Sequence, residues 1–243
     1  MLEISILTLF PESLNAVLNK SIIGAAIKSG RLSVDCIQIR EHTHDKQCRV
    51  DDYPYGGGMG MVMQADPLYN AWKSVIEKNG GKRLHTVLMS AQGKVYTQHD
   101  ARRLSLYDKF IIICGHYEGV DQRFIDECVD EEISIGDFVL TGGEIPALAI
   151  VDSVGRILPG VLADESCYTQ ESHWSGLLEH PHYTRPEIWR GISVPEVLLS
   201  GNRDNIKKWR RLLSLRLTQK RRPDLLKKLK LSQEDKGLLK ENS

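Results

Sequence analysis

Cysteine is scarce in this sequence, and its five positions fit neither a disulfide framework nor a zinc site. Cys36, Cys48, Cys114, Cys128 and Cys167 are odd in number, widely spaced and free of any Cys-x-x-Cys pair. Both kinds of site need paired or clustered thiols. A reducing cytoplasm is therefore the expected location of the protein.

Long apolar runs are absent as well. No apolar stretch of the sequence approaches the ~20 residues that a bilayer-spanning helix needs. The first residues carry Glu3 inside a short apolar run and lack a basic leader. We expect neither export nor membrane insertion.

Several catalytic signatures are missing too. The sequence has no Ser-His-Asp motif, no His-Glu-x-x-His, no Walker element and no Asp/Glu-x-Gly-x-Gly-x-Gly loop of the common Rossmann-type methyltransferases. The glycine run at residues 55–61 lacks the Gly-Lys-Ser/Thr of a phosphate loop, which disfavours a nucleoside triphosphate. His42 and His44 have no committed third ligand, and such pairs are more often surface residues than metal ligands.

An excess of one charge is also lacking, because Lys plus Arg and Asp plus Glu each number 32. The charges are nevertheless segregated: residues 118–144 are acidic with Arg123 as their one base, whereas residues 203–230 are basic. A basic helix predicts phosphate contact, with a solvated surface as the alternative. The basic residues on the expected helix are Lys207, Lys208, Arg210, Arg211 and Arg216, beside Trp209.

Strand and helix patterns alternate along the chain. With 243 residues, of which 41% are hydrophobic, the protein can bury a substantial core, and the βαβ rhythm predicts an α/β fold with a parallel sheet. Strands are expected at residues 4–9, 32–39, 84–89, 110–114 and 132–135. Helices are expected from Pro11 to residue 27, at 65–78, at 97–106 with Thr97 as cap, at 120–129, 145–158 and 202–218, and in two shorter segments near the end.

Glycine loops follow three of the expected strands, at Gly93, at Gly115 and at residues 136–143. In a parallel sheet the carboxyl ends of the strands share one edge, where open α/β folds bind ligands. Gly142 and Gly143 lack a Cβ, so backbone N–H groups there can approach a ligand or another strand closely. The sequence therefore predicts a ligand pocket at this edge.

Four longer motifs, taken in order, closely resemble the bacterial tRNA (guanine-N1) methyltransferases of the SPOUT superfamily. They are Tyr-Gly-Gly-Gly-Met-Gly-Met at 55–61, Cys-Gly-His-Tyr-Glu-Gly-Val-Asp at 114–121, Ser-Ile-Gly-Asp-Phe-Val-Leu-Thr-Gly-Gly-Glu-Ile-Pro-Ala at 134–147, and Pro-His-Tyr-Thr-Arg-Pro at 181–186. The resemblance covers nearly the whole chain.

The resemblance implies a SPOUT-type α/β domain at residues 1–160, with a parallel sheet and a deep trefoil knot that binds S-adenosylmethionine. Little apolar periodicity and several small or polar residues predict a flexible linker at 161–172, followed by a small, mostly α-helical tRNA-binding domain at 173–243. A homodimer, the acceptor guanine 37 of tRNA, next to the anticodon, and Mg²⁺ that can assist the reaction are implied too. General topology rules make a knot improbable, and periodicity could not have predicted it.

Site residues follow from the same resemblance. Glu171 in Gln-Glu-Ser-His-Trp falls on the proton acceptor, and Arg156 in Val-Gly-Arg-Ile-Leu-Pro-Gly on an electrophilic helper. Without the resemblance, Glu171 would be a solvated linker residue and Arg156 a helix C-terminal arginine. The residues expected to hold the cofactor are Ala91, Gly93, Gly115, Tyr117, Glu118, Gly119, Ile135, Gly136, Phe138, Leu140, Thr141, Gly142, Gly143 and Pro146.

The sequence departs from the family pattern at a few positions. Glu171 replaces the usual aspartate, which keeps the carboxylate but adds a methylene. His116 stands where Arg is common, Ala91 replaces a frequent proline, and His173-Trp174 replaces a Phe and a small residue. A SPOUT enzyme acting on another RNA, and an RNA-binding protein with a vestigial pocket, stay open as alternatives.

Overall fold

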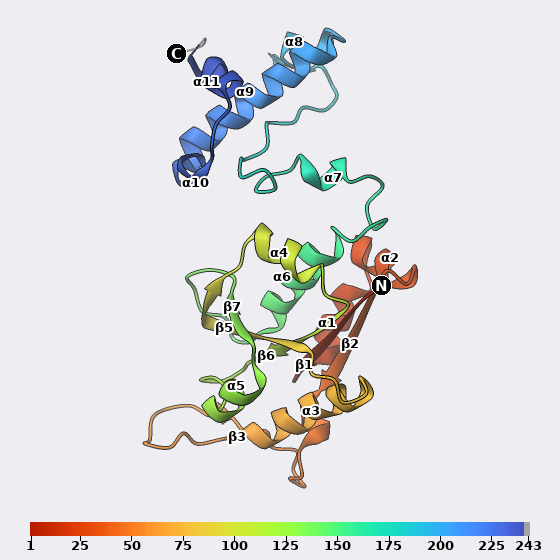
Figure 1. Cartoon of the computed structure of the whole chain (residues 1–243), viewed down its shortest axis with the longest axis vertical. Coiled ribbons are helices and arrows are strands. Elements are labelled where there is room, and N and C mark those ends of the chain that lie inside the picture. The colour runs from red at the N-terminus through yellow and green to blue at the C-terminus, as the bar shows by residue number, and fades with distance from the viewer. Residues whose placement is uncertain (241–243) are drawn as a thin grey trace. The chain divides into compact units, whose positions relative to one another are not determined.

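A five-stranded parallel sheet lies at the centre of the N-terminal part of the chain in this computed structural model, which describes residues 1–240 (Figure 1). The strands are hydrogen-bonded in the order β2-β1-β6-β5-β7, and every pair is parallel. The predicted α/β fold with a parallel sheet is confirmed. The strands are β1 (Leu2–Thr8), β2 (Leu32–Gln38), β5 (His85–Val95), β6 (Lys109–Cys114) and β7 (Glu131–Ser134).

The central strands are buried on both faces, which explains their nearly continuous apolar sequences. Ile112 of β6 lies beside Ile6 of β1 and Val87 of β5, and all three side chains are fully buried.

Helices cover the two faces of the sheet (Figure 1). The helices α3 (Ala65–Lys78) and α5 (Gln122–Cys128) pack together on one face. Another four pack on the other face, with α6 in contact with each of its neighbours: α1 (Pro11–Leu18), α2 (Ser21–Lys28), α4 (Gln98–Leu104) and α6 (Glu144–Gly155).

Local sequence signals account for several helix ends. Pro11 occupies the first turn of α1, where its missing N–H has no intrahelical partner to lose. Thr97 and Asp100 form the capping box of α4, in which the Thr97 N–H donates to the Asp100 carboxylate at 3.0 Å. The predicted cap at Thr97 and the predicted helix at 65–78 are confirmed.

One predicted strand end is wrong. We expected a strand over 84–89, but β5 continues to Val95 through a bulge of four residues, 90–93. Met89 and Lys94 both pair with Ile133 of β7, so the bulge loops out between them and the ladder resumes. The predicted long loop at 40–63 also contains short elements: η1 (Ile39–His42), β3 (Asp51–Asp52) and β4 (Val62–Met63).

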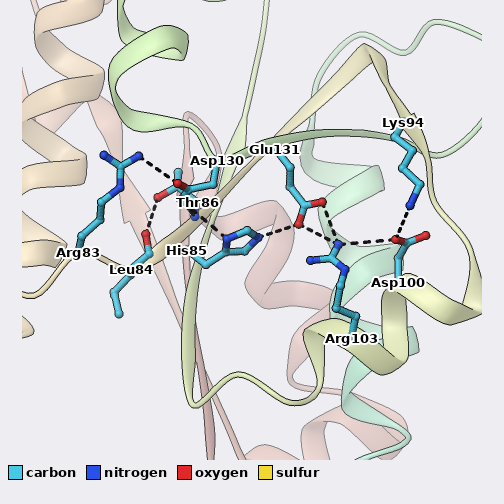
Figure 2. Close-up of polar contacts among 9 residues, drawn as sticks. All are labelled: Arg83, Leu84, His85, Thr86, Lys94, Asp100, Arg103, Asp130 and Glu131. Carbon is cyan, nitrogen blue, oxygen red and sulfur yellow. Dashed lines mark hydrogen bonds and ion pairs between the residues drawn. The ribbon is translucent and has the colours of Figure 1, made fainter.

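A network of charged side chains begins at the amino ends of β5 and β7 (Figure 2). Its centre is Glu131, which accepts hydrogen bonds from Arg103 Nη2 at 2.8 and 2.9 Å and lies 2.7 Å from His85 Nε2. Burial raises the pKa of Glu131, but the hydrogen bonds from His85 and Arg103 outweigh it, so the net pKa lies below its ordinary value. The members are Arg83, His85, Lys94, Asp100, Arg103, Asp130 and Glu131.

The chain divides into two compact units, Met1–Asp164 and Glu165–Ser243. The division falls inside the segment 161–172 that we predicted as a linker, where α7 (Ser166–Thr169) forms one helical turn. The functions assigned to the three predicted segments stay predictions.

The C-terminal unit is built around one long helix, α9 (Arg203–Arg221). Leu215 and Thr218 of α9 are fully buried, and the Thr218 hydroxyl accepts a hydrogen bond from the Leu178 N–H at 2.8 Å. Asp235 is also buried, and it pairs with both Nε and Nη2 of Arg211 at 2.7 and 2.9 Å. The other elements are β8 (Ile188–Trp189), β9 (Ile192–Ser193), α8 (Glu196–Leu199), α10 (Pro223–Lys228) and α11 (Gln233–Lys240).

Among the helices of residues 1–240, none is both long and apolar enough to cross a membrane.

Candidate active site at the carboxyl edge of the sheet

Segments at the carboxyl edge of β5, β6 and β7 enclose a cavity of about 260 Å³. These three strands are neighbours, so the β5 bulge, the loop after β6 and the loop after β7 meet at one edge of the sheet. The walls therefore come from segments far apart in the sequence, at residues 88–92, 115–125 and 132–146.

The turn at Gly142 and Gly143 closes one wall of the cavity. The Gly143 N–H donates to the Gly115 carbonyl at 2.9 Å. A Cβ on Gly143 would lie 2.6 Å from Cys114 Cα, and a Cβ on Gly142 would overlap the His116 ring. Only glycine fits this close approach of two backbone segments, so the predicted close approach of the backbone at Gly142 and Gly143 to another strand is confirmed.

A partly buried polar contact ties the loop after β6 to the start of α6. His116 Nε2 lies 2.7 Å from Glu144 Oε2, and the Thr8 hydroxyl donates to Glu144 Oε1 at 2.6 Å. The side chains of His116 and Glu144 are 14% and 13% exposed, so solvent screens this contact weakly. His116, noted in the sequence only as a departure from the family, thus joins the ends of β1 and β6 to α6.

The loop after β6 also packs against the end of the glycine run at 55–61. The Glu118 N–H donates to the Met61 carbonyl at 3.0 Å, and the Met63 N–H donates to the Gly119 carbonyl at 2.9 Å. A Cβ on Gly60 would overlap the Glu118 side chain. Two of the motifs that carry the resemblance are therefore in direct contact.

The charge of the cavity limits what it can bind. Glu118 and Glu132 line it, no Lys or Arg does so among the described residues, and neither carboxylate forms an ion pair within residues 1–240. Ile135, Phe138 and Leu140 supply an apolar wall. Such a cavity suits a ligand with a positive charge and a flat apolar ring, and it disfavours a polyphosphate.

Apart from Gly93 and Gly136, every residue predicted to hold the cofactor lines this cavity. Gly93 packs on the neighbouring strand, where a Cβ would lie 2.5 Å from the backbone at Glu132 and Ile133. Gly136 has a φ of +150° and a carbonyl that accepts a hydrogen bond from the Ser134 hydroxyl at 2.9 Å. The role of the set in binding stays a prediction. The predicted residues in the lining are Ala91, Gly115, Tyr117, Glu118, Gly119, Ile135, Phe138, Leu140, Thr141, Gly142, Gly143 and Pro146.

The two predicted catalytic residues lie outside this lining. Arg156 directly follows α6, at the opposite end of this 12-residue helix from Gly143, which corresponds to about 18 Å. Glu171 belongs to the C-terminal unit, in a turn where its N–H donates to the Tyr168 carbonyl at 3.3 Å. The rings of Tyr168 and Trp174 pack on each other at 4.7 Å across this turn. Both catalytic roles stay predictions.

Several polar residues of the lining were not predicted from the sequence. Ser90 and Gln92 flank Ala91 in the β5 bulge, and Glu132 lies in β7. Ser90 and Gln92 belong to the same loop as Gly93, which the sequence marked as a glycine loop, so the loop as a whole was the available signal. Nothing in the sequence predicted that Glu132 lines the cavity. Its position depends on the pairing of β7 with Lys94 and Val95, the β5 residues that follow the bulge, and only the structure shows this pairing.

Within residues 1–240, no group of three or more His, Cys, Asp and Glu side chains is arranged to hold a metal ion. The predicted assistance by Mg²⁺ stays untested.

Comparisons with known proteins show that the chain is similar to methyltransferases that act on tRNA. A family model described as tRNA (Guanine-1)-methyltransferase TrmD matches residues 2–228. The chain is 51% identical to a tRNA (guanine-N(1)-)-methyltransferase of Ruminiclostridium cellulolyticum, over 94% of this chain and 97% of that protein. It is also 51% identical to the protein of that name from Clostridium botulinum (strain Kyoto), covering 99% and 98%, and 48% identical to that of Alkaliphilus oremlandii, covering 98% and 97%.

Proposed function

The chain belongs to the tRNA (guanine-1)-methyltransferase family, and on this premise we propose that it transfers the methyl group of S-adenosylmethionine to N1 of guanine 37 of tRNA. The observation that carries the proposal is the cavity in which the family's glycine motifs meet. The predicted resemblance to this family is confirmed by the match over residues 2–228.

The cavity suits the proposed methyl donor. S-adenosylmethionine supplies a sulfonium-activated methyl group, and its positive charge matches the carboxylates of Glu118 and Glu132. The apolar wall of Ile135, Phe138 and Leu140 suits an adenine ring, and the backbone of the turn at Gly142 and Gly143 can bind its polar edge.

Two residues of the chain would act on the guanine. Guanine N1 carries a proton at neutral pH, so it becomes a good nucleophile only as that proton leaves and negative charge grows on O6. We assign the proton acceptor to Glu171, an effect that is worth ~10²–10⁴-fold in rate. We assign stabilisation of the charge on O6 to the guanidinium of Arg156.

A homodimer is part of the proposal. Because Arg156 follows the far end of α6 from the cavity of its own unit, the partner's copy is the better source of this guanidinium. Val139 and Ile145 are 84% and 62% exposed beside the cavity, which supports an apolar contact with a second copy. We also propose the SPOUT-type deep trefoil knot, assistance by Mg²⁺ and a cytoplasmic location, where tRNA is available.

We assign tRNA binding to the C-terminal unit, within the predicted domain 173–243, and guanine capture to the predicted linker 161–172. The contacts of the basic residues of α9 indicate which of them are better placed to bind tRNA phosphates. Arg211 is engaged with the buried Asp235, so Lys207, Lys208 and Arg210 remain the better candidates for phosphate contact.

The test is methyl transfer from labelled S-adenosylmethionine to tRNA transcripts that carry G or A at position 37. We expect label only on the G37 transcript, at N1. Label on another nucleotide would indicate a SPOUT enzyme with another target, and binding of tRNA without any transfer would indicate a vestigial pocket.

A further inference from the structure

A second and larger cavity lies entirely within the C-terminal unit. Its volume is about 580 Å³, and its walls come from the extended segment at 180–187, from residues 194–199 and from α9. The hairpin of β8 and β9 supports one wall, since the Val194 N–H donates to the Glu187 carbonyl at 2.9 Å. No step of the proposed methyl transfer uses this cavity.

Aromatic rings are concentrated in its lining. The rings of Tyr183 and Trp209 lie 6.3 Å apart, and those of His180 and His182 lie 4.7 Å apart. Tyr183 is 48% exposed, so much of its ring is accessible, whereas Trp209 is more deeply placed on α9. A half-exposed ring beside an open cavity provides a surface on which a planar group can stack.

Two guanidinium groups line the same cavity. Neither Arg185 nor Arg210 forms an ion pair with a carboxylate of residues 1–240, in contrast to Arg211 and Arg222, which pair with Asp235 and Asp224. Unpaired guanidinium groups next to aromatic rings are the combination that binds single-stranded nucleic acid, through phosphates and bases respectively.

One carboxylate also lines the cavity. Glu187 can accept hydrogen bonds from the amino group of a base, as a carboxylate does with cytosine N4. Uracil has no amino group, so Glu187 favours adenine, cytosine or guanine over uracil.

We propose that this cavity binds one unpaired nucleotide of the tRNA substrate, distinct from the guanine that is methylated. Its base stacks on Tyr183, its flanking phosphates contact Arg185 and Arg210, and Glu187 accepts from its amino group. The inference rests on the proposed function in that tRNA is taken as the ligand. The site would fix the register of the tRNA on the C-terminal unit.

The test uses the full-length protein and a tRNA transcript. Ultraviolet cross-linking followed by mass spectrometry should attach one unpaired, amino-bearing nucleotide to a peptide from residues 180–187 or from α9. Tyr183→Ala should weaken tRNA binding by about 5-fold or more, whereas Tyr183→Phe, which keeps the ring, should bind normally. Arg210→Ala should weaken binding and make its salt dependence shallower, compared with the exposed matched control Arg221→Ala on the same helix.

The outcomes separate this inference from the proposed function. Cross-links confined to other segments, or equal affinity of Tyr183→Ala and wild type, would overturn the cavity assignment while G37 methylation by wild type persists. A protein or small molecule as the true occupant would give that same negative result with tRNA. Should Tyr183→Ala fail to fold, the wild-type cross-link and the tRNA affinity of Arg210→Ala still test whether the cavity binds a nucleotide. If wild type binds tRNA and cross-links here but transfers no methyl group, the proposed function fails and the cavity assignment stands.

Discussion

The two ends of the paired strands β5 and β7 serve opposite purposes. At their amino ends, His85, Asp130 and Glu131 belong to a network in which each charge has a partner (Figure 2). At their carboxyl edge, Glu118 and Glu132 line a cavity without an ion pair among the described residues, and glycines replace side chains.

The difference shows how one sheet can combine stability with binding. In a satisfied ion pair each charge is occupied by its partner and is not available to a ligand, and removing one partner leaves the other uncompensated, which destabilises the fold. Unpaired carboxylates and accessible backbone groups add little to stability, but they can bind. Changes at the amino end should therefore lower stability, and changes at the carboxyl edge should lower activity.

The largest expected effect concerns the chemistry that the carboxyl edge serves. Glu171→Gln keeps the shape of the side chain but removes the proposed proton acceptor, so turnover should fall ~10²–10⁴-fold. Affinity for S-adenosylmethionine and the melting temperature should be unchanged. Single-turnover kinetics with a G37 transcript measure the effect, and an unaltered rate would remove the assignment of Glu171 as the base.

The next effect concerns the turn at the carboxyl edge itself. Gly143→Ala places a Cβ 2.6 Å from Cys114 Cα and 3.0 Å from the Gly115 nitrogen, so the two backbone segments must separate. We expect a loss of donor affinity of about 10-fold or more, equivalent to at least about 1.4 kcal/mol, in calorimetric titration with S-adenosylmethionine. Gly237→Ala is the control, because its Cβ would meet nothing within 4 Å. Normal donor binding by Gly143→Ala would separate this turn from the cofactor site.

A change at the amino ends of β5 and β7 should lower stability and leave activity intact, the reverse of the changes at the carboxyl edge. Glu131→Gln removes the charge that pairs with Arg103 and His85, so the free energy of unfolding should fall by about 1–3 kcal/mol while methyl transfer is retained. The exposed Glu12→Gln, on α1, is the matched control in urea unfolding.

The pH dependence of the free energy of unfolding of Glu131→Gln tests whether the loss of stability comes from the missing charge. The folded state holds the pKa of Glu131 below its ordinary value of 4.5, so its contribution is fully present above about pH 4.5 and is lost as the pH falls through the lowered pKa. The stability gap between wild type and Glu131→Gln should shrink over that range. A gap independent of pH would point to packing rather than charge.

The smallest expected effects are changes in melting temperature when either of two bidentate ion pairs of the C-terminal unit is broken. Arg211 lowers the pKa of the buried Asp235 to about 2, so this pair stabilises the unit above about pH 3.8 and loses its effect as the pH falls toward 2. Asp235→Asn should therefore lower the melting temperature measurably at pH 7 and weaken tRNA binding only through stability. Asp224→Asn, which breaks the exposed Arg222 pair, should change little. Equal losses for the two variants would mean that burial does not decide the worth of an ion pair here.

Local sequence signals determined the elements of the fold. Apolar runs at 110–114 and 4–9 predicted buried strands, Thr97 predicted a helix cap, and the spacing at 65–78 predicted α3 with its observed bounds. Such features depend on residues within a few positions of one another, where propensity and periodicity are informative. The glycine loops also marked in advance the edge of the sheet at which the cavity lies, because parallel strands bring their carboxyl ends together whatever their order.

Only the tertiary structure decided which of these parts meet. The contact of Thr8 with Glu144 spans 136 positions of the chain, and the pairing of Arg211 with Asp235 joins α9 to α11 across 24 positions. The β5 bulge and the cavity lined by Tyr183 and Trp209 likewise depend on how separate segments pack. Sequence patterns report local conformational preference. These contacts form only when segments far apart in the chain pack together as the whole chain is buried, so no local pattern could have predicted them.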